Sequence, residues 1–161
     1  MNSIYLIFGG NLGDRHQNIL KARNFIQNEL GRIIRYSSVY ETEPWGFDHE
    51  QSFLNQVAEV QSLLSAEEML KKIKNFEEIS GKGKRETVYL PREIDVDILF
   101  FNREFINMPE LTVPHPRLHE RRFVLEPLNE IIPDFIHPVM KKSISQLLEE
   151  CSDQKWVKKL N

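Results

Sequence analysis

Apolar residues follow both strand and helix spacings along this chain, which predicts alternating strands and helices. An apolar run at residues 4–8 predicts a buried strand over 3–9, followed by a turn at 9–13. Asp14 is the expected N-cap of a first helix, and Gly31 is expected in a left-handed conformation at its C-terminal end. Between them, four apolar residues recur at helical spacing: Ile19, Ala22, Ile26 and Leu30.

Two segments rich in β-branched and aromatic residues, 32–42 and 53–63, predict strands on either side of a loop at 43–52. Ser65 and Glu68 have the spacing of a capping box, which predicts the start of a second helix. Gly81 is expected to end it. The apolar stripe of this helix is formed by Met69, Leu70, Ile73 and Phe76.

The rest of the chain predicts a strand over 94–101, a short return strand near 104–107 and a proline-bounded loop at 111–116. Helices are expected over 121–130, limited or kinked at Pro127, and over 143–151. The resulting βαββαβ order predicts a ferredoxin-like α+β fold with a mostly antiparallel sheet, helices packed on it and extra C-terminal helices. No repeat or long linker divides the chain, so residues 1–161 are expected to form a single domain.

Composition narrows the classes of protein. The chain has 161 residues and a formal net charge of -3, which argues against a general nucleic-acid binder. A single cysteine, Cys151, permits no internal disulfide, and the short N-terminal apolar run is neither a signal peptide nor a membrane span. We therefore expect a cytoplasmic protein without membrane or nucleic-acid partners, and a monomer.

Two carboxylates interrupt the otherwise apolar strand predicted at 94–101. Asp95 and Asp97 alternate with apolar residues, so both lie on one strand face with Cα atoms roughly 6 to 7 Å apart. Such a pair, together with nucleotide phosphates, supplies the oxygen ligands that Mg²⁺ prefers. The alternative is a solvated strand face with two ordinary aspartates.

Neighbouring charges favour the metal and nucleotide interpretation. Glu77 falls on the inward stripe of the second helix, where a carboxylate needs a partner, although it could also swing to solvent. Lys82, Lys84, Arg85 and Arg92 precede or open the acidic strand and would neutralise a triphosphate, although charged surface loops are common.

Other polar and aromatic residues suit a flat heterocycle. Phe53 and Asn55 project to the same side of a strand, so a ring could stack on Phe53 while the Asn55 amide reads its edge; Trp45 or Phe123 could cover the other face. The alternative places Phe53 in the core. His115, held between two prolines, could bind nucleotide phosphate or ribose, or could simply be exposed.

Three ordered motifs carry a resemblance to a known family. They are Pro91-Arg92 followed by IDVDIL at 94–99, LTVPHP at 111–116, and RRFVLEPL at 121–128. Weaker matches stand in the same order at Gly9 with 11–14, at 37–42 and at 53–55. From Gly9 to about Pro138, the chain resembles the 6-hydroxymethyl-7,8-dihydropterin pyrophosphokinases.

The resemblance implies an ATP-dependent diphosphotransferase of folate synthesis, with ATP and a pterin as substrates and two Mg²⁺ ions bound by Asp95 and Asp97. It implies pterin contacts for Thr42, Glu43, Pro44, Trp45, Phe53, Asn55 and Phe123. It implies ATP contacts for Glu77, Lys84, Arg92, Ile98, Thr112, His115 and Arg121. We expect catalysis to depend on Lys82, Arg92, Asp95 and Asp97.

Some features depart from the family pattern and leave rivals open. Lys82 and Lys84 stand where the family usually has arginines, which exchanges a bidentate phosphate contact for a point charge. One rival is a metal-dependent phosphohydrolase that uses the same aspartates. The other is a non-catalytic ligand- or RNA-binding module on a ferredoxin-like fold, although the chain lacks an aromatic RNP-type strand motif.

Overall fold

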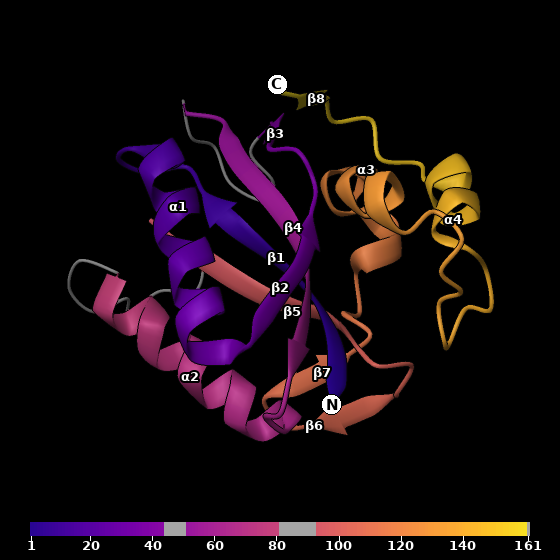
Figure 1. Ribbon diagram of the computed structural model, residues 1–161. Coiled ribbons are helices and arrows are strands. Elements are labelled where there is room, and N and C mark those ends of the chain that lie inside the picture. Colours follow the sequence, from indigo (N-terminus) through magenta and orange to yellow (C-terminus); the bar gives the residue numbers. More distant parts are fainter. Residues whose placement is uncertain (44–50, 81–92, 161) are drawn as a thin grey trace.

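The computed structural model describes residues 1–43, 51–80 and 93–160 (Figure 1). Its main sheet is antiparallel throughout, in the order β5-β1-β4-β3-β8, with β2 also paired to β4. These strands are β1 (Asn2–Gly10), β2 (Arg32–Tyr36), β3 (Tyr40–Thr42), β4 (Phe53–Ser62), β5 (Asp95–Phe101) and β8 (Val157–Lys159). The predicted ferredoxin-like α+β fold is confirmed.

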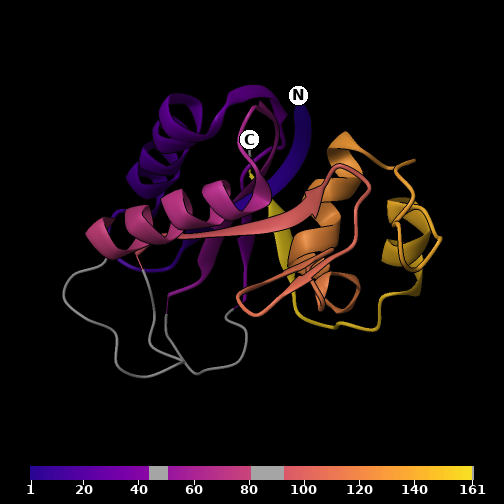
Figure 2. The ribbon, with the colours of Figure 1, turned by 90° about the horizontal axis from the view of Figure 1, so that it is seen from below.

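Helices cover both faces of the sheet, as the view from below shows (Figure 2). One face carries α1 (Arg15–Phe25), which continues into the π-helical turn η1 (Ile26–Leu30), and α2 (Ala66–Ser80). The other face carries η2 (Leu118–Glu120), α3 (Arg122–Ile131) and α4 (Ile144–Glu150). A separate hairpin pairs β6 (Ile106–Met108) with β7 (Leu111–Val113).

The alternation along β1 divides the buried side chains between two cores. Ile4, Leu6 and Phe8 pack with α1 and α2, whereas Tyr5 and Ile7 pack with α3 and α4. A strand covered on both faces needs apolar residues on both, which explains the continuous apolar run at residues 4–8 of β1. None of the helices in the described part of the chain is long and apolar enough to cross a membrane.

The predicted helix starts are confirmed by their caps. The Asp14 carboxylate accepts a 3.1 Å hydrogen bond from the Gln17 backbone N–H at the start of α1. At the start of α2, Ser65 and Glu68 bond reciprocally: the Ser65 N–H donates to Glu68 at 2.8 Å, and the Glu68 N–H donates to Ser65 Oγ at 3.1 Å. Each cap satisfies backbone donors that the first helical turn leaves without intrahelical partners.

Gly31 does not adopt the predicted left-handed conformation. Its φ of 165° is extended backbone, and α1 ends through the π-helical turn η1 instead. The glycine is needed for another reason: a Cβ there would lie 2.2 Å from the Gln61 carbonyl oxygen. Close approach of two backbones therefore explains this residue.

The single strand predicted over 32–42 is two strands, β2 and β3, separated at Ser37. The Ser37 Oγ accepts from the Val57 N–H at 3.0 Å, and its carbonyl accepts from Gln56 Nε2 at 2.6 Å. These bonds replace part of the β4 ladder, so both pieces still pair with β4 but the strand is interrupted.

The segment 111–116, predicted as a loop, begins with β7. The short return strand predicted near 104–107 lies at Ile106–Met108 and pairs with β7 rather than continuing the main sheet. Helix α3 begins and ends within one residue of its predicted bounds and contains Pro127.

Candidate active site

The register of the sheet brings polar residues from distant parts of the chain into one row. Gly9 of β1 lies opposite Asp95 of β5 on one side and opposite Asn55 of β4 on the other. Asn55 in turn lies opposite Tyr40 of β3. Because Ile7 faces the core beneath α3 and α4, Gly9 two residues later faces the same side. The row therefore runs across the sheet face that α3 covers.

Gly9 allows β1 and β4 to approach closely in the middle of this row. A Cβ at this position would lie 1.8 Å from the Leu54 carbonyl oxygen and 2.8 Å from Asn55 Oδ1. Only a glycine fits, because the Leu54 backbone and the Asn55 side chain already occupy the volume that a side chain would need. The sequence predicts a turn from Gly9 onward, whereas β1 continues to Gly10 between β4 and β5. No local sequence pattern shows which strands lie on either side of Gly9.

The two aspartates share one face of β5, as the sequence predicts. Val96 and Ile98 belong to the core under α1 and α2, so Asp95 and Asp97 point to the opposite face. Asp97 lies opposite Ile7 and is exposed, and Asp95 is half-buried. Both carboxylates can therefore reach a ligand above the sheet.

Glu77 of α2 is anchored to β5 rather than turned to solvent. Its carboxylate accepts a 2.9 Å hydrogen bond from the Val96 backbone N–H. Since β5 is an edge strand of the main sheet, this bond satisfies a donor at the edge and fixes α2 beside the two aspartates. The residue is thus held next to the predicted metal position.

A pocket of about 310 Å³ lies beside β5, between α2 and the hairpin β6–β7. It brings together Asp97, Ile98, Thr112 and His115, four of the residues predicted for the nucleotide and its metal. Its other lining residues are Leu70, Ile73, Val96, Pro109, Glu110, Leu111 and Pro116. Apolar walls with a few convergent polar groups suit a nucleotide.

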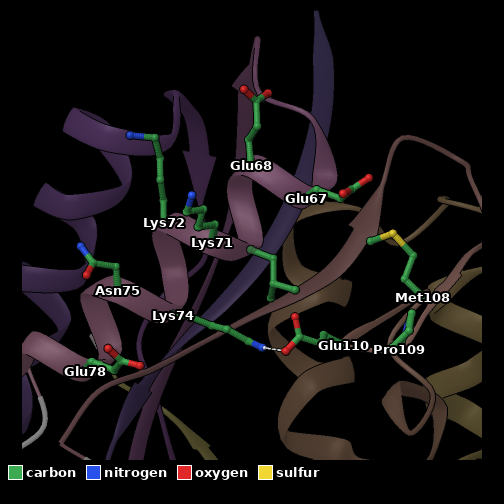
Figure 3. A pocket seen from close by; sticks show the side chains of 11 residues that line it. Glu67, Glu68, Lys71, Lys72, Lys74, Asn75, Glu78, Met108, Pro109 and Glu110 are labelled. Atoms are coloured by element: carbon green, nitrogen blue, oxygen red, sulfur yellow. Dashed lines mark hydrogen bonds and ion pairs between the residues drawn. The ribbon is translucent and has the colours of Figure 1, made fainter.

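A wider groove of about 1020 Å³ lies along the outer side of α2 and meets the same hairpin (Figure 3). Lys74 and Glu110 form a 2.9 Å ion pair across it, from α2 to the hairpin (Figure 3). The groove contains none of the predicted site residues, and its charged lining is mixed. The smaller pocket therefore fits the predicted chemistry better.

His115 is held firmly at the rim of the smaller pocket. Its backbone N–H donates to the Leu99 carbonyl at 3.0 Å, and its Nδ1 accepts from the Arg117 N–H at 3.4 Å. Burial, followed by the charges of Arg121 and Arg117, lowers the pKa of His115 to about 4. The imidazole is neutral at pH 7, and with Nδ1 accepting, Nε2 carries the proton and can donate to an anion.

Arg121 connects this pocket to the start of α3. Burial and then the charge of Arg117 lower the pKa of its guanidinium, whereas the charge of Asp97 raises that pKa. The guanidinium carbon lies 5.8 Å from the centre of the Phe123 ring. Arg121 is therefore near both Asp97 of the acidic strand and the aromatic residue predicted to cover the pterin.

Three of the residues predicted for the pterin, Thr42, Phe53 and Asn55, face the same side of the sheet. Thr42 and Asn55 are 2% and 9% exposed, and Phe53 is half-buried and lies opposite Thr42. Phe123, in the first turn of α3, packs at the margin of the core below that helix. The structure thus brings the predicted ring-binding residues together between β3, β4 and α3.

Glu43 makes contacts that the sequence did not predict. Its carboxylate accepts from the Trp156 N–H at 3.2 Å and pairs with Lys155 at 3.7 Å. The remaining predicted site residues, Pro44, Trp45, Lys82, Lys84 and Arg92, lie outside the described residues and stay predictions.

Comparison with known proteins decides the family. The family model described as 7,8-dihydro-6-hydroxymethylpterin-pyrophosphokinase (HPPK) matches residues 5–133. The chain belongs to this family. It is 41% identical over 150 residues to a 2-amino-4-hydroxy-6-hydroxymethyldihydropteridine pyrophosphokinase of Aquifex aeolicus (strain VF5), covering 93% of this chain and 92% of the relative.

Further relatives agree with this assignment. The chain is 41% identical over 133 residues to the pyrophosphokinase of the same name from Bacillus subtilis (strain 168), covering 81% of this chain and 79% of the relative. A solved structure of Plasmodium falciparum HPPK-DHPS with pteroate matches with a TM-score of 0.76 at 21% identity, covering 92% of this chain. This chain spans only 42% of that longer protein, so the likeness supports the fold alone.

Proposed function

We propose that this pyrophosphokinase-family chain transfers pyrophosphate from ATP to the hydroxymethyl group of 6-hydroxymethyl-7,8-dihydropterin in folate biosynthesis. Its relatives from Aquifex aeolicus and Bacillus subtilis are named for this activity, and the similarity covers most of their length. The products are AMP and the pterin diphosphate. A cytoplasmic monomer without nucleic-acid or membrane partners remains our expectation.

Asp95 and Asp97 fit a magnesium site. Their carboxylates share one strand face, on which Asp97 is exposed and Asp95 half-buried, and Gly9 of β1 lies opposite Asp95. Among the described residues no group of three or more His, Cys, Asp or Glu side chains could hold a metal, so the nucleotide and water would complete the octahedral shell. Two bound Mg²⁺ ions would supply charge neutralisation of the triphosphate.

The nucleotide is proposed to occupy the pocket of about 310 Å³ beside β5. Ile98 and Thr112 would line its base and sugar, and neutral His115 would donate a hydrogen bond from Nε2 to a phosphate or ribose oxygen. Arg121 would face the phosphates, and Glu77 would fix the start of β5. Lys82, Lys84 and Arg92 are proposed to add further positive charge.

The pterin is proposed to lie on the sheet face that carries Thr42, Phe53 and Asn55, below the first turn of α3. Its ring would stack between Phe53 and Phe123. Buried Asn55 and Thr42 would read its edge, since an amide offers both donors and an acceptor. Glu43, Pro44 and Trp45 are proposed to complete this side.

The protein would then catalyse the reaction mainly by positioning the two substrates, without forming a covalent intermediate. The hydroxymethyl oxygen attacks the β-phosphorus, its proton is released, and the bond from the β-phosphorus to the oxygen shared with the α-phosphate breaks, so AMP leaves. Arg121 and the proposed basic residues stabilise the charge that spreads over the phosphates. The two binding regions meet at Asp95 and Gly9.

One observation carries this proposal: the sheet register places Asp95, Gly9 and Asn55 in one row, so a pterin beside Asn55 would lie next to a nucleotide held at the aspartates. The test is to incubate the protein with ATP and Mg²⁺, with and without hydroxymethyl-dihydropterin, and to quantify AMP. We expect AMP only when the pterin is present. Phosphate release without pterin would favour the phosphohydrolase, and no turnover would favour a non-catalytic module.

A further inference from the structure

The segment from Cys151 to Leu160, here called the C-terminal strap, leaves α4, passes along α3 and ends in β8 at the edge of β3 (Figure 1). It lies beyond residues 5–133, the part of the chain that the family model matches. Its side chains alternate between half-buried and exposed from Cys151 to Lys158, so one side of the strap rests on the protein. Both ends of this strap contact elements of the proposed pterin site.

At one end, Asp153 caps α3. The α3 N-cap residue, Arg121, makes no side-chain capping bond. Instead the Asp153 carboxylate accepts a 2.9 Å hydrogen bond from the Arg122 backbone N–H, and the Asp153 carbonyl accepts from Arg122 Nε at 3.2 Å. A carboxylate at a helix N-terminus is favourable for both hydrogen bonding and the helix dipole. This cap holds the turn that carries Phe123.

At the other end, the strap closes the free edge of β3. Val157 of β8 lies opposite Thr42, and the Glu43 N–H donates to the Trp156 carbonyl at 3.3 Å. The Glu43 carboxylate is held in return by the Trp156 N–H and by Lys155, at 3.2 Å and 3.7 Å. These contacts fix the strand end that carries Thr42.

We propose that the C-terminal strap sets the spacing of the pterin site, with Asp153 as its main positioning residue. It ties the helical turn of Phe123 to the strand end of Thr42 and Glu43, two elements that are far apart in the sequence. A ring stacked between an α3 residue and a β4 residue depends on that spacing, because π-stacking falls off steeply with distance. The inference rests on the proposed function of this site.

The test compares Asp153→Ala and Asp153→Asn with the wild type. The alanine variant loses both acceptors, Oδ2 for the Arg122 N–H and Oδ1 for the Lys155 N–H at 3.0 Å. The asparagine variant keeps one oxygen, which can accept from the Arg122 N–H. Asp153→Ala is expected to raise the KM for the pterin about fivefold, the factor that corresponds to a typical lost helix cap. The KM for ATP should rise less, since the strap does not line the nucleotide pocket beside β5 and acts on that side only through the charge of Asp153 on Arg121. Asp153→Asn should restore most of the pterin KM.

Glu150→Ala is the matched control, because Glu150 pairs with Lys142 on the exposed side of α4 at 2.6 Å. Its pterin KM should equal that of the wild type. If Asp153→Ala does not fold, Asp153→Glu keeps the charge but displaces the acceptor, and should also raise the pterin KM selectively.

Two results would overturn the proposal. One is a folded Asp153→Ala protein with a lowered unfolding temperature but a pterin KM within about twofold of the wild type, the pattern of a cap that matters for stability alone. The other is a pterin KM in Asp153→Asn as high as in Asp153→Ala. Absence of pterin-dependent AMP in the wild type would instead reject the proposed function, so the two failures can be told apart.

Discussion

The nucleotide side and the pterin side of the proposed site are assembled in different ways. Among the described residues, most of the nucleotide side (Asp97, Ile98, Thr112, His115 and Arg121) comes from the stretch 97–121, and Glu77 joins it from α2. The pterin side takes Thr42, Asn55 and Phe123 from separate elements, β3, β4 and α3. The nucleotide side thus draws mainly on one stretch of sequence, whereas the pterin side depends on sheet register and on tertiary contacts.

This difference predicts how each side responds to change. On the nucleotide side, losses should follow from removing groups that touch the ligand. On the pterin side, residues that never touch the ring, such as Tyr40 and Asp153, should also matter because they hold its walls in place. Variants that change the KM for one substrate more than the KM for the other therefore test this comparison.

The largest expected effect lies where the two sides meet. Asp95→Ala and Asp97→Ala should each lower kcat by about a thousandfold or more, because each removes a carboxylate that the metal-bound triphosphate requires. The free energy of unfolding should change by less than about 1 kcal/mol, since Asp97 is exposed and Asp95 half-buried. Steady-state kinetics and urea unfolding measure the two quantities.

Asp134→Ala is the control for the aspartate variants, because Asp134 is exposed and lies outside the site. It should retain the wild-type kcat. Full activity in Asp95→Ala and Asp97→Ala would contradict the proposal that these aspartates bind the metal. It would also contradict the proposal that the nucleotide and the pterin meet at Asp95.

Gly9→Ala should damage the pterin side most. The new Cβ would lie 1.8 Å from the Leu54 carbonyl oxygen, so the backbone must move, at a cost of about 3 kcal/mol in unfolding free energy. Gly13→Ala is the matched control: its nearest neighbour is 4.0 Å away, but its φ of 63° makes alanine strained by about 1 kcal/mol. Equal stability of the two variants would show that the row has more room than the structure indicates.

Acid pH should reduce stability through two histidines with lowered pKa values. Burial lowers the pKa to about 4 for both His115, on the nucleotide side, and His137, whose Nδ1 accepts from the Val139 and Met140 N–H groups at 3.1 Å and 3.0 Å. Between pH 6.5 and 4 the unfolded chain binds these protons and the folded chain does not. The stability that each neutral histidine contributes is therefore fully present above about pH 6.5 and is lost as the pH falls toward 4, by about 3 kcal/mol per histidine.

Urea unfolding at several pH values checks this prediction. His137→Gln should be less stable at pH 7 but show a shallower loss toward pH 4. His16→Gln, at an exposed position in α1, should keep the wild-type slope. An unchanged slope in His137→Gln would contradict the assignment.

Tyr40→Phe should have the smallest effect and should be confined to the pterin side. The Tyr40 hydroxyl donates to Glu130 of α3 at 2.8 Å, which links the strand beside Asn55 to the helix of Phe123. Its loss should cost about 1 kcal/mol and raise the pterin KM more than the ATP KM. Tyr36→Phe, at an exposed ring, is the control. An ATP KM that rises more than the pterin KM would contradict the comparison.

The sequence predicted the elements with strong local patterns. The buried strand β1, the capped helix α2 and the acidic face of β5 follow from apolar periodicity, a reciprocal cap and strict alternation. The fold class follows from their order. Local free energies dominate in these segments, so short windows of sequence suffice.

Other features depend on contacts that no short window contains. The break at Ser37 arises from hydrogen bonds to β4, and the need for glycine at positions 9 and 31 arises from backbones that approach from β4. The strap could not be predicted either, since nothing in the sequence near Asp153 indicates that it caps a helix beginning at Arg122. Tertiary structure sets these features and the pterin side with them.

Calorimetric titration with a non-hydrolysable ATP analogue, with and without Mg²⁺, tests the central claim most directly. The account predicts that the wild type binds one nucleotide in a Mg²⁺-dependent manner and that Asp95→Ala combined with Asp97→Ala abolishes the Mg²⁺ dependence. Nucleotide binding that is absent from the wild type, or that responds to Mg²⁺ equally in the double variant, would contradict it.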